Sequence, residues 1–303
     1  MSEQAVSEGA IQPIGFLVAL SSDWQVSRVS ASIGDHLGIT AAEALNQPIT
    51  SLFAEDAVHS LRNRLCLLRN PDSVERLLGI ALTGGESAYD VALHMSGETV
   101  VVEAEPSRGD HHDRDSTGTV RGMVAQLGSI ATLPAFFTES ARQMRALTGF
   151  DCVYIQRVWA DGRVEVAGDA VRSGARSIVS TSSFADDSAA DHSHHLTIIA
   201  DTSSDPVAII AAAKARRRPL DLSNSLLRAP PPARVAALRE AGIGAAIMVP
   251  LVVSGRKWGE IACYHRAPSC PSFERRSAIE WFALMLAMQI EIRELKAALE
   301  PAP

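Results

Sequence analysis

The side chains best suited to chemistry form two histidine clusters. Residues 191–195 read Asp-His-Ser-His-His, and His192 and His195 could share a metal ion if they stood three apart on a helix. Residues 110–113 read Asp-His-His-Asp and lie between two stretches of strand character. Both clusters have polar surroundings, which favour solvated loops. We therefore expect no metal site at either of them.

The other reactive groups do not form a catalytic set. The run Arg216–Arg218 could bind an anion, but a solvated charge run is the simpler interpretation. Cys263 could be a redox thiol, although a cysteine within a buried strand is usually unreactive. Residues 242–244 read Gly-Ile-Gly before a strand rather than a helix, so they are no dinucleotide fingerprint. With no nucleophile–base–acid set and no paired carboxylates, we expect this segment not to be an enzyme.

The composition indicates a globular protein of two domains. The chain has 303 residues, 47% of them hydrophobic, which suffices for two separate cores. Its net charge of −7 argues against binding to nucleic acid. It has no apolar run long enough for a membrane span and no signal peptide at its start, so we expect a cytoplasmic protein. Its four cysteines form no C-x-x-C pattern, and we expect them to be reduced.

The first part of the chain has the pattern of a small antiparallel sensor domain. Apolar periodicity predicts one longer helix over residues 54–69, and Pro71 follows it. Alternating and β-branched stretches between turn residues predict the strands. The expected strands are 15–20, 26–33, 77–83, 87–95, 98–104 and 119–127.

The second part is organised around the stretch from Gly242 to His265. Two apolar runs there flank residues 254–257, Ser-Gly-Arg-Lys, which predicts two central antiparallel strands joined by a hairpin turn at Gly255. Before this hairpin we expect a helix over 133–147 and strands over 152–158 and 164–171. The intervening residues 174–242 form a long insertion, which usually has a functional role or is disordered.

The chain closes with a helix that carries a heptad seam. Residues 272–299 have apolar side chains that step 4-3-4-3-4 along the sequence. These residues are Trp281, Met285, Met288, Ile292, Leu295 and Leu299. A 3.5-residue period favours a two-stranded coiled coil or a packed bundle. We expect Trp281 and Met285 to pack on their own domain, and Ile292, Leu295 and Leu299 to pair with another chain.

Four segments resemble the bacteriophytochromes. Residues 9–17, Gly-Ala-Ile-Gln-Pro-Ile-Gly-Phe-Leu, resemble the segment that opens the PAS domain of that family. Residues 218–228 resemble its Leu-Asp-Leu-Ser segment, and residues 238–243 its Leu-Arg-Asn-Met-Gly-Val segment. Residues 258–265 resemble its Trp-Gly-Leu-Ile-Ala-Cys-His-His segment. The segments occur in the family's order, so the chain resembles a bacteriophytochrome PAS–GAF sensory pair.

This resemblance implies an α/β (α+β) fold of two domains, each with a central antiparallel sheet and flanking helices. It implies an N-terminal segment at 1–13, a PAS domain at 14–128, a GAF domain at 129–271 and a C-terminal helix at 272–303. The insertion at 174–242 would be a lasso that the N-terminal segment threads, forming a figure-of-eight knot. The family also implies a homodimer and an output histidine kinase domain or another signalling partner.

Phytochromes bind a linear tetrapyrrole, and the matching pocket positions are altered in this sequence. Residues 1–65, where bacterial members attach biliverdin, contain no cysteine, and Ala233 stands near the plant-type attachment position. The positions that match the pocket are Ser182, Thr197, Arg228, Arg234, Ala246, Met248 and Tyr264. Among them only Arg228 keeps the family's residue type, since the resemblance implies serines at 246 and 248, histidines at 234 and 264, and an arginine at 197. Burying the two propionates without partners costs several kcal/mol, so we expect no cofactor. The alternative is biliverdin or another linear tetrapyrrole bound non-covalently.

Three functions therefore stay open. The first is a phytochrome-like sensory input module that does not bind biliverdin, relaying a conformational signal through dimeric C-terminal helices. The second is a red/far-red photoreceptor that holds a bilin non-covalently or through an atypical cysteine such as Cys263. The third is a PAS–GAF scaffold that dimerises and binds a partner protein.

Overall fold

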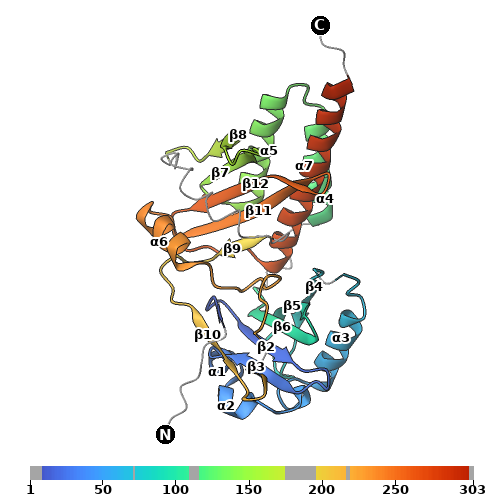
Figure 1. The fold of residues 1–303 in the computed structure, drawn as a ribbon, viewed down its shortest axis with the longest axis vertical. Helices are drawn as coiled ribbons and strands as arrows, with labels where there is room; N and C mark the ends of the chain where they lie inside the picture. Colours follow the sequence, from blue (N-terminus) through green and yellow to red (C-terminus); the bar gives the residue numbers. More distant parts are fainter. Residues whose placement is uncertain (1–8, 71, 109–115, 175–195, 216–218, 300–303) are drawn as a thin grey trace. The chain divides into compact units, whose positions relative to one another are not determined.

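The computed structural model describes residues 9–70, 72–108, 116–174, 196–215 and 219–299. The chain forms two compact units, drawn in Figure 1. The first contains residues 1–109 and 204–230, and the second contains residues 110–203 and 231–303. The long insertion is thus divided between the units, because its residues 204–230 belong to the first. Each unit has its own sheet and is described separately.

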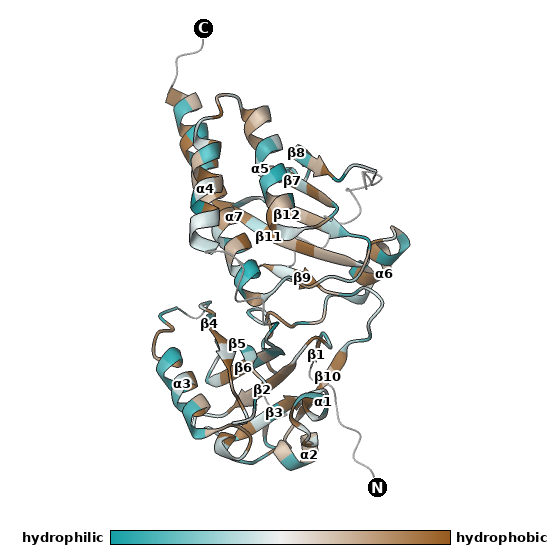
Figure 2. Ribbon diagram, turned by 180° about the vertical axis from the view of Figure 1, so that it is seen from behind, coloured by the Kyte–Doolittle hydropathy of each residue, from teal (hydrophilic) through white to brown (hydrophobic). Residues whose placement is uncertain are grey.

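The first unit is a seven-stranded antiparallel sheet with helices on one face. The strands, in spatial order, are β1 (Ala10–Ile11), β10 (Val207–Ala211), β3 (Val26–Ser30), β2 (Phe16–Leu20), β6 (Thr99–Pro106), β5 (Tyr89–Ser96) and β4 (Glu75–Ile80). The helices are α1 (Ile33–Leu37), α2 (Ala41–Ala44), the 3₁₀ turn η1 (Ile49–Ser51) and α3 (Glu55–Leu65). All the strands expected before residue 105 are present. Helix α3 turns a hydrophilic surface outwards (Figure 2).

Alternation along β2 explains how both faces of this sheet are covered. Phe16, Val18 and Leu20 pack with the helices, whereas Leu17 and Ala19 point to the opposite face. On that opposite face, Ile11 of β1 and Ile209 of β10 belong to the same cluster as Leu17, and Leu220 and Leu227 of the insertion pack onto it. The insertion therefore completes the core of the first unit.

A buried carboxylate fastens the insertion to this sheet. Glu103 of β6 accepts hydrogen bonds from the backbone N–H groups of Leu226 (2.8 Å) and Leu227 (2.9 Å) and from the hydroxyl of Ser225. The ring of His94 on β5 is also buried, with its Nδ1 3.9 Å from Oε2 of Glu103. The N–H of Gln12 donates to the carbonyl of Leu227 (2.7 Å), so the N-terminal segment contacts the same part of the insertion.

One expected strand is a helix. Residues 119–127 lie within α4 (Ser116–Gly128), which belongs to the second unit. The β-branched and glycine content of this stretch suggested a strand, but Val120, Met123, Val124 and Leu127 are spaced to form one face of a helix. That face packs into the core of the second unit, so burial of the stripe outweighs the weak helix propensity.

The second unit is a five-stranded antiparallel sheet between two layers of helix. The strands, in spatial order, are β8 (Val164–Val171), β7 (Cys152–Val158), β12 (Arg256–His265), β11 (Ala245–Val253) and β9 (Thr197–Ile199). Helices α4, α5 (Leu133–Thr148) and α7 (Phe273–Leu299) cover one face, and α6 (Pro232–Glu240) packs on the other (Figure 1). Helix α5 and strands β7 and β8 confirm the expectations for residues 133–171.

The hairpin of β11 and β12 is central to this sheet, as expected. Its turn is Ser254-Gly255, and both residues have positive φ (50° and 72°), which is the geometry of a two-residue hairpin loop. Gly259 is required because a Cβ there would lie 1.9 Å from the carbonyl oxygen of Gln156 on β7. Gly259 therefore permits close pairing of β12 with β7.

Helix α7 has one buried face and one exposed apolar face. The buried face packs into the core through Ile279, Phe282, Leu286 and Ile290. The seam expected from the sequence lies on the other face, where Leu295 is 58% exposed. Trp281, Met288, Ile292 and Leu299 are also exposed, and Met285 is partly buried. Trp281 is 39% exposed, so it packs on its own domain only in part.

Candidate functional site: the tyrosine face of the second sheet

One face of the second sheet brings most of the predicted pocket positions together. We call it the tyrosine face. It comprises Cys152, Tyr154, Ile199, Leu238, Ile243, Ala246, Met248, Ala262 and Tyr264. The strand residues are there because alternate side chains of β7, β9, β11 and β12 point to one side. Leu238 of α6 and Ile243, which follows that helix, pack onto them.

The register of the strands arranges these residues in two rows. In one row, Ile199, Ala246, Tyr264 and Cys152 lie opposite one another on four adjacent strands. In the next row, Thr197, Met248, Ala262 and Tyr154 do the same. Four of the predicted positions, at 197, 246, 248 and 264, therefore belong to two neighbouring rows of one surface.

The other predicted positions lie elsewhere. Arg234 lies on α6, and its positive charge acts on the phenol of Tyr264, so it belongs to the edge of this face. Arg228 belongs to the first unit, where it forms a β-bridge with Ile11 and its carbonyl accepts from Nε2 of Gln12 (3.2 Å). Ser182 lies outside the described residues. The clusters at 110–113 and 191–195 and the run at 216–218 lie outside them as well.

Two tyrosine rings occupy the middle of this face. The centroids of Tyr154 and Tyr264 are 6.1 Å apart with their planes tilted by 49°, and both side chains are about 2% exposed. Burial, together with the charge of Glu260, raises the pKa of Tyr264, so its phenol stays protonated at neutral pH. The described residues that form the face are therefore apolar side chains and two phenols.

The two buried strand cysteines lie on opposite sides of the sheet. Cys263 faces the helical layer, where burial raises the pKa of its thiol and keeps it unreactive. Cys152 lies on the tyrosine face, directly opposite Tyr264. If a thiol attaches a ligand at this face, Cys152 has the right orientation and Cys263 does not. The sequence alone could have shown that Cys263 does not lie on the tyrosine face. Neighbouring strand residues point to opposite faces, and Tyr264 was expected in the pocket.

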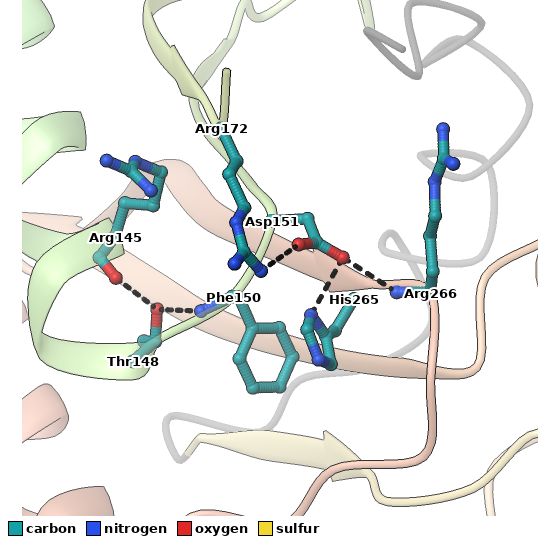
Figure 3. A network of polar contacts seen from close by, with 7 residues as sticks. All are labelled: Arg145, Thr148, Phe150, Asp151, Arg172, His265 and Arg266. Carbon is teal, nitrogen blue, oxygen red and sulfur yellow. Dashed lines mark hydrogen bonds and ion pairs between the residues drawn. The ribbon is translucent and has the colours of Figure 1, made fainter. Parts of the chain in front are cut away.

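A polar network that the sequence did not indicate lies at one end of the face (Figure 3). The carboxylate of Asp151 is 2.8 Å from Nδ1 of His265, and it accepts from the N–H of Arg266 (3.1 Å) and from Nη1 of Arg172 (3.4 Å). Burial alone would raise the pKa of Asp151, but these three partners together hold it below its usual value. The network joins the start of β7 to the ends of β8 and β12 and so positions Tyr264. Its only sequence signal was charge at strand ends.

A metal ion and a membrane span find no support in the described part of the chain. Among the described residues, no three His, Cys, Asp or Glu side chains lie close enough to hold an ion. None of the helices that the structure describes is both long and apolar enough to cross a bilayer.

Comparison with known proteins matches both units to families. Residues 2–107 match the PAS fold family, and residues 132–293 match the GAF domain family. Among curated proteins, cyanobacterial phytochrome B of Nostoc sp. is 28% identical over 298 residues, covering 94% of this chain and 39% of its own length. The bacteriophytochrome of Pseudomonas aeruginosa is 26% identical, covering 93% of this chain and again 39% of the relative. The chain thus spans about two fifths of these relatives.

Solved structures agree with the family matches. The chromophore-binding domain of an unusual bacteriophytochrome from R. palustris is 29% identical, with a TM-score of 0.81, covering 97% of this chain and 99% of that one. The photosensory core module of the Stigmatella aurantiaca phytochrome is 24% identical and shares the fold, with a TM-score of 0.83 over 96% of this chain and 60% of that one. The chain therefore belongs to the GAF domain family, and it is a bacteriophytochrome-like PAS–GAF module.

Proposed function

We propose that this module is a sensory input that does not hold biliverdin, and that it relays a conformational signal through dimers of α7. The observation that carries the proposal is the tyrosine face itself. Ala246, Met248 and Tyr264 stand where the bacteriophytochrome resemblance implies two hydroxyl groups and a histidine. They form one packed apolar surface together with Tyr154.

Electrostatics supports this proposal. A bilin has two propionates, and burying an ionised carboxylate without partners is strongly unfavourable. The tyrosine face offers neutral phenols and aliphatic groups in place of hydroxyl and imidazole partners. Arg234, at the edge of the face, is one remaining cation in the second unit that could meet a carboxylate. An uncharged or weakly charged ligand would fit this surface better than a bilin.

The test is an absorption spectrum of the purified protein with and without biliverdin. The wild type should show only the spectrum of free biliverdin. The triple variant Ala246→Ser, Met248→Ser, Tyr264→His restores the polar groups that the resemblance implies, and it should gain a sharpened far-red band. A far-red band in the wild type would refute the proposal.

The second candidate function is a photoreceptor with atypical attachment, and the position of Cys152 favours it. Zinc-induced fluorescence on a denaturing gel detects a covalently bound bilin. A fluorescent wild-type band that disappears in Cys152→Ser but persists in Cys263→Ser would establish this second function.

The same proposal includes the partners and the limits of the domains. A PAS–GAF module is sensory rather than catalytic, and we propose a histidine kinase domain or a separate signalling protein as its output. We propose sequence limits of 14–128 for the PAS domain and 129–271 for the GAF domain, with the N-terminal segment threading the insertion. Within these limits, residues 116–128 pack with the second unit and residues 204–230 with the first. The pairing of β1 with β10 supports that threading because it brings Ile11 and Val207 together. A homodimer through the exposed seam of α7 would connect the module to its output.

A further inference from the structure

A cavity of about 280 Å³ lies among the three helices on the side of the second sheet opposite the tyrosine face. Its lining comes from the start of α4, the second half of α5 and the start of α7 with the residue before it. The lining residues used below are Ser116, Met123, Gln143, Leu147, Glu274, Arg275 and Ala278, and Ala146 lies at its exposed edge. None of them belongs to the tyrosine face, so this cavity is a separate feature.

The side chain of Gln143 is the unusual element of this cavity. It is 7% exposed, and its amide nitrogen and amide oxygen are both buried without a hydrogen-bond partner among the described residues. An unsatisfied buried polar group costs about 1–3 kcal/mol, so an apolar residue here would make the helical layer more stable. A side chain kept at such a cost in a cavity wall indicates that something else satisfies it.

The rest of the lining defines what that partner must be. The hydroxyl of Ser116 donates to Oε1 of Glu274 (3.0 Å), and the adjacent Arg275 is exposed. The charges of Glu274 and Arg275 balance, which disfavours an ion as the occupant. Met123, Leu147 and Ala278 supply apolar walls. The cavity volume is just below the usual range for ligand sites, about 300–1,000 Å³, so its occupant must be small, such as one or two fused rings.

We propose that this cavity binds a small uncharged heterocycle that presents an amide-type edge, with a hydrogen-bond donor and an acceptor side by side. The Gln143 amide pairs with that edge, its NH₂ donating to the ligand's carbonyl oxygen and its oxygen accepting from the ligand's N–H. The aliphatic residues contact the faces of the ring. Two sources share this chemistry, the carboxamide-substituted pyridines and the lactam-containing nucleobases.

Binding is measured by ligand-observed NMR and by thermal unfolding of the whole chain. The probes are nicotinamide for the carboxamide source, and uracil and hypoxanthine for the nucleobase source, with benzene as an apolar control of similar size. We expect one source to bind with Kd below about 1 mM and to raise Tm. Benzene should bind at least tenfold more weakly than that probe. If no probe binds below about 10 mM, or if benzene binds as tightly as the amides, the proposal is wrong.

Two variants locate the site. Gln143→Leu has a similar volume and removes the amide, so it should raise the Tm of the free protein and weaken probe binding at least tenfold. Ala146→Trp places an indole at the exposed edge of the cavity and should also weaken binding without touching Gln143. Gln126→Leu, an exposed glutamine of α4 outside the cavity, is the matched control and should bind as the wild type does. Unchanged binding in both Gln143→Leu and Ala146→Trp would overturn the proposal.

Discussion

The Glu103 carboxylate should control how firmly the insertion is held on the first sheet. Glu103 receives two buried backbone N–H groups, those of Leu226 and Leu227, and the hydroxyl of Ser225. Substitution by alanine leaves all three donors without this acceptor. We therefore predict that Glu103→Ala destabilises the first unit and loosens residues 219–230.

The magnitude follows from the number of donors. Each buried donor left unpaired costs about 1–3 kcal/mol, and removal of the buried charge returns part of its desolvation cost. The expected loss for Glu103→Ala is therefore about 3–5 kcal/mol. Glu103→Gln keeps one carbonyl oxygen, and if that oxygen takes the place of Oε1 it still accepts from Ser225 and Leu227. Glu103→Gln should therefore lower the free energy of unfolding by about half as much as Glu103→Ala.

Two measurements check this prediction. Urea unfolding measures the loss in the global free energy of unfolding. Hydrogen exchange of the peptide that covers residues 219–230 measures the loss in the free energy of local opening. Opening of the Leu226 and Leu227 amides should become at least a hundredfold more frequent, since about 1.4 kcal/mol corresponds to a factor of ten. Glu86→Ala removes an exposed carboxylate of the same unit and should change neither quantity.

The reasoning would be refuted by protection of these amides that equals the wild type in Glu103→Ala. It would also be refuted if Glu103→Gln were the more damaging variant. The first outcome would mean that the apolar contacts of the insertion hold it without the carboxylate. The second would mean that the amide, and not the loss of an acceptor, disturbs the sheet.

Three further predictions concern the second unit. Because its partners hold the pKa of Asp151 below the unfolded value of about 3.9, its contribution to stability is present above that pH and is lost as pH falls through the folded pKa. The Tm gap between wild type and Asp151→Asn should thus be present at pH 5 and close below about pH 4, and a gap that persists at low pH would contradict this. Leu295→Glu places a charge in the exposed seam of α7 and should weaken dimers at least a hundredfold in analytical ultracentrifugation, whereas Ala297→Glu, off the seam, should not. Glu294 accepts a hydrogen bond from Nε1 of Trp258 at 2.9 Å. Glu294→Ala should therefore lower the free energy of unfolding in urea by about 1 kcal/mol and shift tryptophan emission to the red. Unchanged emission would show that this bond does not order the indole.

Local patterns in the sequence were enough for most elements. Strands β7 and β8, the hairpin turn at Gly255 and the long helix α7 were predicted close to their observed bounds, because period and turn chemistry act over a few residues. The same local reasoning failed at residues 119–127, where glycine and β-branched residues indicated a strand and the observed element is α4. Tertiary burial of one helical stripe decided that element.

The sequence by itself determined which residue types occupy the tyrosine face, since Ala246, Met248 and Tyr264 can be assigned by their places in recognisable segments. Only the tertiary structure decided what surrounds them. Register brought Thr197 and Cys152 into the same rows, and β10 joined the first sheet although its sequence neighbours serve the second. The reason is physical: strand pairing and burial connect residues far apart in the chain, and no local period records which distant strand a segment will meet.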